Sequence, residues 1–184
     1  GYAFLANVIY ENLTGDFGGL KMPMIFSNNK VLQRGMPLPV WGTANAGDKI
    51  TVSFNHLTKT VVADLEGKWK IVFPEMTVNT VPQAMRITDN EMTIEYKNIL
   101  IGDVWLCSGQ SNMYLPLKVT GNNEEAIANA GKQKNIRLFK FKPIAETDDV
   151  AWDTDVLNKI NDLQYFTGGW KNDNAEDAKN FSAV

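Results

Sequence analysis

A serine flanked by small polar residues follows an apolar run near the middle of the 184-residue sequence. The apolar run occupies residues 104–107, and Ser111 is the second serine of the turn Ser-Gly-Gln-Ser-Asn that follows it. A serine nucleophile must be exposed at the carboxyl end of a strand, among small neighbours that admit a substrate carbonyl. The pattern therefore makes Ser111 a candidate nucleophile for acyl transfer. Ordinary turn chemistry is the alternative, because serine and glycine are common in turns.

Two backbone features of this turn fit the same chemistry. Gly109 has no Cβ, so it can take a positive φ or admit other atoms closely. The N–H of Ser111 lies at the start of the segment after the turn, where it is suited to holding an oxyanion. The order Gly-Gln-Ser-Asn differs from the Gly-x-Ser-x-Gly nucleophile elbow, although the physical logic is similar.

The elements that must position this serine begin with a β-rich stretch at residues 22–100. Ile50, Val52 and Phe54 alternate with polar residues, so they are predicted to share the buried face of one strand. Similar runs recur at roughly ten-residue spacing between turn signals. We therefore predict a β-sandwich module of the immunoglobulin kind over 22–100, preceded by an extension at 1–21.

The pattern changes near residue 101. A buried strand is predicted to end at Cys107, with Trp105 packed in the core and Cys107 buried and inert. A helix is predicted within 122–134, with Asn122 or Asn123 as its N-cap and Gly131 as its stop. A short helix is predicted at 153–163, another is predicted to begin after Asn174 as its cap, and a strand is predicted over 136–141. The order strand, turn, helix, strand is typical of the opening of an α/β sheet. Residues 101–184 are therefore predicted to begin a second, α/β domain.

The composition argues against several classes of function. The formal net charge is −3 with both signs interspersed, and no basic stripe indicates a nucleic-acid partner. No apolar run is long enough to indicate a membrane span. Cys107 is the only cysteine, so an intrachain disulfide is impossible, and the cysteine count does not decide the compartment.

Several motifs resemble the sialate O-acetylesterase family, within the SGNH-type (GDSL-like) hydrolases. GDVWLCSGQSNM at 102–113 is similar to the family's nucleophile block. IFSNNKVLQRGMPLPVWG at 25–42 resembles the signature FSDNMVLQR…PVWG of its N-terminal β-module. EGKW and NILIGDVWL match in order and spacing, and the resemblance covers about residues 20–184.

The resemblance implies an esterase mechanism. Ser111 would attack the acetyl carbonyl of an O-acetylated sugar, and water would then release acetate from the acetyl-enzyme. Gln110 and Asn112 would fix the turn and hydrogen bond to the substrate or the oxyanion loop, with bonding inside the turn as an equal alternative. A histidine oriented by an acidic residue would serve as the general base. No metal or organic cofactor is needed.

The resemblance also implies an architecture, a partner and a location. Residues 101–184 would be the incomplete start of a three-layer, flavodoxin-like SGNH hydrolase domain. The partner would be an O-acetylated carbohydrate, with sialic acid as the eponymous sugar and acetylated xylan as the alternative. Two other classes stay open: a non-catalytic carbohydrate-binding or spacer module, and a split gene product that needs a partner polypeptide. The family indicates a secreted or periplasmic protein, although the sequence carries no clear signal peptide.

The catalytic partners of Ser111 are missing from the sequence. The family's GESN-like and D-x-x-H-like blocks do not occur, and the only histidine is His56 in the β-rich part. We interpret His56 as a turn or surface residue. The acidic stretch Asp148, Asp149, Asp153 and Asp155 is interpreted as a solvated loop. The chain is therefore predicted to be an N-terminal fragment with little catalytic power of its own.

Four further positions carry predictions. Lys30 replaces a methionine of the family signature and is predicted to lie at the surface. Tyr114 replaces a residue that is more often acidic in the family, which affects substrate contacts rather than the nucleophile. Gln33 and Arg34 are suited to binding across a module interface or to forming a polar pair at a strand edge, and we favour the strand edge.

Overall fold

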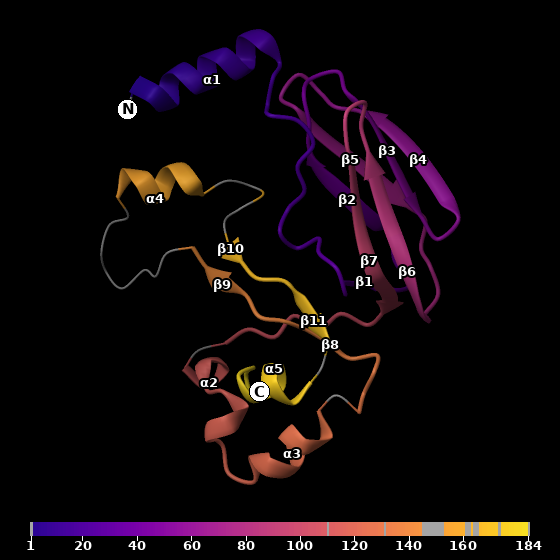
Figure 1. The fold of residues 1–184 in the computed structure, drawn as a ribbon, viewed down its shortest axis with the longest axis vertical. Helices are drawn as coiled ribbons and strands as arrows, with labels where there is room; N and C mark the ends of the chain where they lie inside the picture. Colours follow the sequence, from indigo (N-terminus) through magenta and orange to yellow (C-terminus); the bar gives the residue numbers. More distant parts are fainter. Residues whose placement is uncertain are drawn as a thin grey trace.

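The chain folds into a β-rich part followed by short helices and strand pairs (Figure 1). The computed structural model describes residues 2–109, 111–130, 132–144, 153–160, 163, 166–172 and 174–183. We call residues 22–102 the β-module and residues 103–183 the second region. Helix α1 (Tyr2–Thr14) precedes both of them. None of the described helices is long and apolar enough to cross a membrane.

Two sheets make up the β-module. Its strands are β1 (Val31–Gln33), β2 (Leu38–Thr43), β3 (Lys49–Phe54), β4 (Leu57–Val62), β5 (Lys68–Phe73), β6 (Asn79–Thr88) and β7 (Thr93–Gly102). One sheet has five strands in the order β1-β7-β6-β3-β4, and the other pairs β2 with β5. Strand β1 runs parallel to β7, whereas the other pairs in the module are antiparallel, so the larger sheet is mixed.

One hydrophobic core lies between these sheets, and the period-two alternation of the strands builds it. Ile50, Val52 and Phe54 are buried on one face of β3, as predicted. Phe73 of β5 meets Phe54 edge-on, with ring centroids 6.4 Å apart. The predicted β-protein is therefore confirmed as a mostly β structure with one shared core, and its immunoglobulin-like class stays a prediction.

The turn between β3 and β4 holds the chain's only histidine. Asn55 and His56 both have positive φ, 48° and 63°, as a two-residue hairpin turn requires. His56 is exposed on this turn. The interpretation of His56 as a turn residue is thus confirmed.

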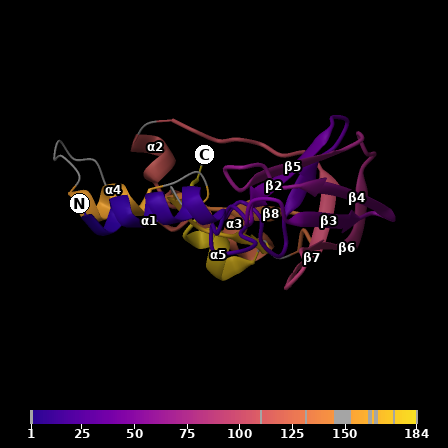
Figure 2. The same cartoon turned by 90° about the horizontal axis from the view of Figure 1, so that it is seen from above.

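The second region consists of short elements. These are α2 (Ser111–Tyr114), the 3-10 helix η1 (Leu117–Val119), α3 (Asn123–Asn129), β8 (Arg137–Phe139), β9 (Lys142–Pro143), α4 (Thr154–Lys159), β10 (Phe166–Thr167), β11 (Trp170–Asn172) and α5 (Ala175–Lys179). Strand β8 pairs antiparallel with β11, and β9 pairs antiparallel with β10. Figure 2 shows these elements from above, beside the β-module. The described strands here form antiparallel ribbons, so the parallel α/β sheet stays a prediction.

Side-chain caps begin two of the helices in the second region. Asn174 caps α5 as predicted, with its Oδ1 accepting from the Asp177 N–H at 2.9 Å. Asp153 caps α4 in the same way through the Val156 N–H. Asn122 precedes α3 in a left-handed conformation without a side-chain cap, and α3 ends at Asn129, close to the predicted stop at Gly131.

The predicted buried strand at 103–107 is wrong. Strand β7 ends at Gly102, and residues 103–109 have no regular secondary structure. Trp105 is 85% exposed, Leu106 is 93% exposed, and Cys107 is also exposed rather than buried. The ladder stops because its last described partner, Gln33 of β1, pairs with Gly102. Beyond it, no described strand pairs with these residues, so nothing holds them in an extended strand.

Candidate active site

The stretch that carries Ser111 begins where the chain leaves β7. We call residues 103–109 the linking segment, because they join the last residue of the β-module to helix α2. Two side chains from the end of β1 contact its first residues. Arg34 binds Asp103 through two hydrogen bonds, Nε to Oδ1 at 2.9 Å and Nη2 to Oδ2 at 3.0 Å. The Gln33 Oε1 accepts from the Val104 N–H at 2.8 Å.

These contacts give Gln33 and Arg34 partners directly after strand β7. Binding across a module interface stays a prediction. The hydrogen bond from Arg34 holds the pKa of the Asp103 carboxyl below its ordinary value. The same hydrogen bond raises the pKa of Arg34. The pair therefore stays ionised over the neutral pH range.

Gly109 lies at the other end of the linking segment. Its φ is outside the left-handed region, so the positive-φ alternative is wrong. A Cβ at Gly109 would lie 2.9 Å from the Cγ of Met113, closer than real Cβ contacts. A side chain at Gly109 would therefore require the Met113 side chain of α2 to shift.

Ser111 opens α2, a helix of 4 residues, and its side chain is exposed. None of the hydrogen bonds between described residues involves the Ser111 hydroxyl. Asn112 is exposed as well, and its carbonyl accepts from the Leu115 N–H at 3.2 Å within the turn. Gln110 lies outside the described residues. The geometry leaves Ser111 accessible to an ester, while its role as nucleophile stays a prediction.

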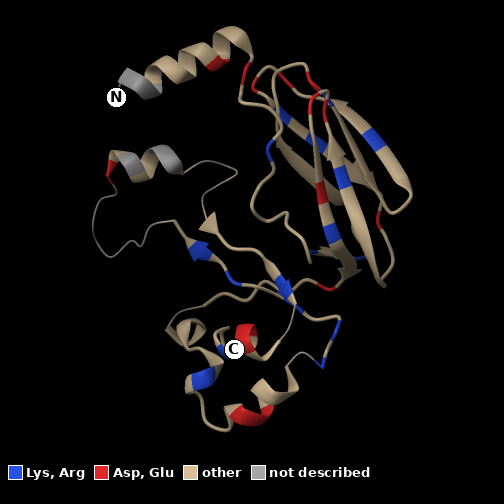
Figure 3. Ribbon diagram, in the orientation of Figure 1, with Lys and Arg blue, Asp and Glu red and all other residues tan. Residues whose placement is uncertain are grey.

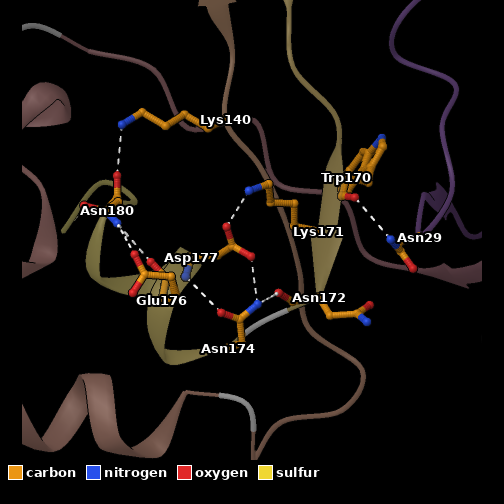
Figure 4. Close-up of polar contacts among 9 residues, drawn as sticks. All are labelled: Asn29, Lys140, Trp170, Lys171, Asn172, Asn174, Glu176, Asp177 and Asn180. Carbon is orange, nitrogen blue, oxygen red and sulfur yellow. Dashed lines mark hydrogen bonds and ion pairs between the residues drawn. The ribbon is translucent and has the colours of Figure 1, made fainter.

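The chain after α2 is fastened to the last described residues. The Leu117 N–H donates to the Phe181 carbonyl and the Ala183 N–H donates to the Leu115 carbonyl, each at 2.9 Å. Lys140 Nζ donates to the Asn180 carbonyl at 2.9 Å (Figure 4). Sequence reasoning missed these anchors, because they join positions far apart in the chain.

Helix α5 in this anchor is held by charge-assisted bonds. Lys171 Nζ binds Asp177 Oδ1 at 2.5 Å, and the Asn174 amide donates to the other Asp177 oxygen at 2.7 Å (Figure 4). The hydrogen bond from Lys171 lowers the pKa of Asp177. These bonds hold the closing end of the chain beside the residues that follow Ser111.

Trp170 of β11 docks on the family-like loop at residues 25–30. Its Nε1 donates to the Ile25 carbonyl at 3.0 Å, and its backbone N–H donates to Ser27 Oγ at 3.1 Å. The Asn29 amide returns a bond to the Trp170 carbonyl at 3.3 Å (Figure 4). The loop therefore joins the β-module to the second region.

Lys30 lies beneath this tryptophan. Only 7% of Lys30 is exposed, so its predicted surface position is wrong. Its Nζ donates to the Ile25 carbonyl at 3.0 Å and lies 4.4 Å from the centroid of the Phe26 ring and 5.7 Å from that of Trp170. Burial lowers the pKa of Lys30 from 10.5 to about 7. The two aromatic rings and the Ile25 carbonyl therefore surround the buried ammonium group.

The other candidate residues do not gather around Ser111. His56 lies in the β3–β4 turn of the β-module, and Asp153 serves as a helix cap. Asp148 and Asp149 lie outside the described residues, as does the side chain of Asp155. The part of the chain that is described contains no group of three or more His, Cys, Asp and Glu suited to a metal ion. Lys and Arg are interspersed with Asp and Glu over both parts of the ribbon (Figure 3).

The chain is similar in sequence to curated sialate O-acetylesterases. The chain is 26% identical to human sialate O-acetylesterase over 136 residues, which are 68% of this chain. It is 25% identical to the rat sialate O-acetylesterase over 143 residues, 72% of this chain. The chain spans only 26% of the length of each of these relatives. No family model matches the sequence.

The fold is also similar to that of a carbohydrate acetylesterase of known structure. The crystal structure of a carbohydrate acetylesterase from Xanthomonas citri superposes with a TM-score of 0.71 and 29% sequence identity. The superposition covers 89% of this chain and 34% of that protein. Sequence and structural similarity together confirm that the chain resembles the sialate O-acetylesterase family.

Proposed function

We propose that this chain is the nucleophile-bearing part of a carbohydrate O-acetylesterase, with Ser111 as the nucleophile. The observation that carries the proposal is the exposed Ser111 at the start of α2, in a chain similar to acetylesterases. The Ser111 hydroxyl would attack the acetyl carbonyl, and the sugar oxygen would leave with a proton from the general acid. Water would then cleave the acetyl-enzyme, release acetate and return the serine.

The substrate follows from the relatives' names only as a class. O-acetylated sialic acid is the first candidate, because the curated relatives are named sialate O-acetylesterases. Acetylated xylan is the second, because the Xanthomonas protein is named only as a carbohydrate acetylesterase. Gln110 and Asn112 flank Ser111 and are proposed to support the turn and the oxyanion. We further propose that such an enzyme acts in a secreted or periplasmic location.

The general base is proposed to come from polypeptide outside these residues. His56 is the only histidine of the sequence, and it is exposed on a turn between β3 and β4. Without a base, a serine hydroxyl is a poor nucleophile at neutral pH, so this chain alone is expected to hydrolyse esters slowly.

The proposed domain arrangement follows the same reasoning. Residues 22–100 would form an immunoglobulin-like β-sandwich after an extension at 1–21, and residues 101–184 would begin an SGNH hydrolase domain. The large exposed surfaces of Trp105 and Leu106 support this proposal, because such side chains are normally covered in a finished domain.

A serine-directed phosphonate tests the nucleophile. The full-length gene product is treated with a fluorophosphonate, and acetate release is measured from O-acetylated sialic acid and from acetylated xylan. Ser111→Ala is expected to abolish both labelling and acetate release. Ser108→Ala is the matched control, because Ser108 is the other serine of the turn Ser-Gly-Gln-Ser-Asn and is exposed. This variant is expected to retain both the labelling and the acetate release.

Two outcomes would contradict the proposal. Labelling that persists in Ser111→Ala would assign the nucleophile elsewhere. No acetate release from any acetylated sugar by the full-length product would favour a non-catalytic carbohydrate-binding or spacer module. If the 184-residue chain becomes active only when the remaining polypeptide is added in trans, the base is supplied from outside it.

A further inference from the structure

We propose that Arg34 and Gln33 of the β-module are positioning residues for Ser111, because they fix where the linking segment leaves strand β7. The proposal rests on the proposed role of Ser111 and deepens it. It assigns to the β-module a part in the geometry of the active site, beyond supporting or spacing a second domain.

The contacts lie at the exact end of the sheet ladder. Strand β1 pairs with β7 up to the register Gln33 with Gly102, and the Arg34 N–H donates to the Gly102 carbonyl at 2.9 Å. Beyond Gly102, no described strand pairs with the backbone of this segment. Side chains bind it there instead: Gln33 Oε1 accepts from the Val104 N–H at 2.8 Å, and Arg34 donates to both carboxylate oxygens of Asp103.

The geometry of these contacts is more restrictive than that of an ordinary surface ion pair. A guanidinium that donates two parallel bonds to one carboxylate fixes the plane and the direction of that carboxylate. Gln33 adds a third bond, to the backbone of the next residue. Together they set the direction in which the chain departs from the sheet.

Among the described contacts, those of Gln33 and Arg34 hold the β7 end of the linking segment, whereas Met113 of α2 lies against its other end at Gly109. Val104 is 40% exposed, Trp105 is 85% exposed and Leu106 is 93% exposed, so packing does not orient these residues. Residues 104–109 have no regular secondary structure. Because Ser111 follows this segment in the chain, the point at which the segment leaves the sheet limits where the serine can lie.

The Arg34–Asp103 ion pair is expected to contribute little to the free energy of unfolding. The side chains of Arg34 and Asp103 are 49% and 51% exposed, and exposed pairs contribute little to folding free energy. Loss of Arg34 should therefore change the position of the segment more than the melting temperature. This difference separates a positioning role from a merely structural one.

The first arm of the test measures position in the 184-residue chain itself. Cys107 is the only cysteine and lies exposed in the linking segment, so one nitroxide label can be attached there. Lys70→Cys on the exposed face of β5 accepts the second label. Double electron–electron resonance measures the distribution of distances between the labels at positions 107 and 70. This distribution is expected to be narrow in the otherwise unchanged chain and to broaden in Arg34→Ala and in Asp103→Asn.

The second arm measures acetate release by the full-length gene product. A misplacement of about 1 Å can lower a rate about a hundredfold. Arg34→Ala is expected to lower kcat about tenfold to a hundredfold with little change in KM, because ground-state binding does not depend on the serine hydroxyl. Arg34→Lys should recover part of the loss, since an ammonium keeps the charge without the planar fork.

Controls isolate the contact. Arg34→Ala combined with Asp103→Asn should be no worse than either change alone, because both remove the same bonds. Arg86→Ala is the matched control: Arg86 also makes two hydrogen bonds to an acidic residue, Glu95, within the β-module. This pair touches no residue of the linking segment, so kcat and the distance distribution should stay unchanged within about twofold.

The outcomes are distinguishable. A distance distribution that is unchanged in Arg34→Ala would overturn the proposal, whatever the activity. Suppose that Ser111→Ala abolishes acetate release, so that Ser111 is the nucleophile. If Arg34→Ala then broadens the distance distribution but leaves kcat unchanged, the positioning role is overturned as well. If Ser111→Ala stays active, the proposed function fails, and the distance arm alone then decides whether Arg34 orients the linking segment.

Discussion

The β-module and the second region bury their apolar residues very differently. The core of the β-module includes Val40, Ile50, Val52, Met85 and Ile87, each 0% exposed. In the described part of the second region, the buried apolar residues are Phe166 at 3% and Ala178 at 8% exposure. Large apolar side chains such as Trp105, Leu106 and Tyr114 are exposed there instead.

Polar anchors and a small aromatic group hold the second region in place of a core. Phe139 contacts Phe166 and Trp170, with ring centroids 5.7 Å and 5.4 Å apart, and Phe141 stacks on Phe166 at 4.9 Å. Lys140 and Asp177 supply hydrogen bonds around α5. The β-module therefore has a hydrophobic core of its own, whereas the second region is held by polar and aromatic contacts, among them those of Trp170 with the β-module.

The largest effect is expected from a cavity in the β-module. Phe54 is 2% exposed, and Phe54→Ala should lower the free energy of unfolding by about 3–5 kcal/mol, because buried aromatic truncations leave a cavity. Urea unfolding followed by tryptophan fluorescence measures the change. Leu65→Ala, at a side chain 89% exposed, is the control and should have little effect. A loss below about 1 kcal/mol in Phe54→Ala would contradict a well-packed module.

An intermediate effect is expected at the junction of the two regions. Burial lowers the pKa of Lys30 from 10.5 to about 7, so between these values the unfolded chain binds more protons than the folded one. The stability of the folded state should thus increase as the pH rises from about 7 to about 10.5. Lys30→Met should stabilise the protein at pH 7 by roughly 1–3 kcal/mol and flatten this pH dependence.

Urea unfolding at several pH values between 7 and 10 measures the effect of Lys30→Met. Lys49→Met is the matched control, because Lys49 is an exposed lysine at the start of β3. Its replacement is expected to leave both the stability and its pH dependence unchanged. An undiminished pH dependence in Lys30→Met would show that another group causes it.

The smallest effect is expected in the linking segment. Trp105 is 85% exposed in the described structure, so Trp105→Ala in the 184-residue chain should change the unfolding free energy by less than about 0.5 kcal/mol. Differential scanning calorimetry measures it. A loss of 2 kcal/mol or more, as for a buried tryptophan, would mean that the segment packs against the module after all and would remove the contrast between the two regions.

Local patterns in the sequence predicted the β-module well. The alternation at Ile50, Val52 and Phe54 defined the buried face of β3, because a strand turns successive side chains to opposite faces. Asn174 was identifiable as a helix cap from its position before an acidic first turn. These signals depend only on near neighbours in the chain.

The same kind of reasoning failed wherever a distant residue decided the outcome. The run at 104–107 has the composition of a buried strand, yet a strand requires a partner, and no described strand pairs with it beyond Gly102. Lys30 has the charge of a surface residue, but the rings of Phe26 and Trp170 lie beside its ammonium group. No local signal shows that Trp170 will reach this loop.

The sequence by itself determined the strands of the β-module, the turn at His56, the family resemblance and the candidate serine, because periodicity, turn residues and motifs are properties of neighbouring positions. The tertiary structure alone decided that Arg34 and Gln33 bind Asp103 and Val104, that Lys30 is buried, and that the linking segment is exposed. Each of these depends on which distant segments meet, and hydrogen bonds and burial exist only once both partners are in place.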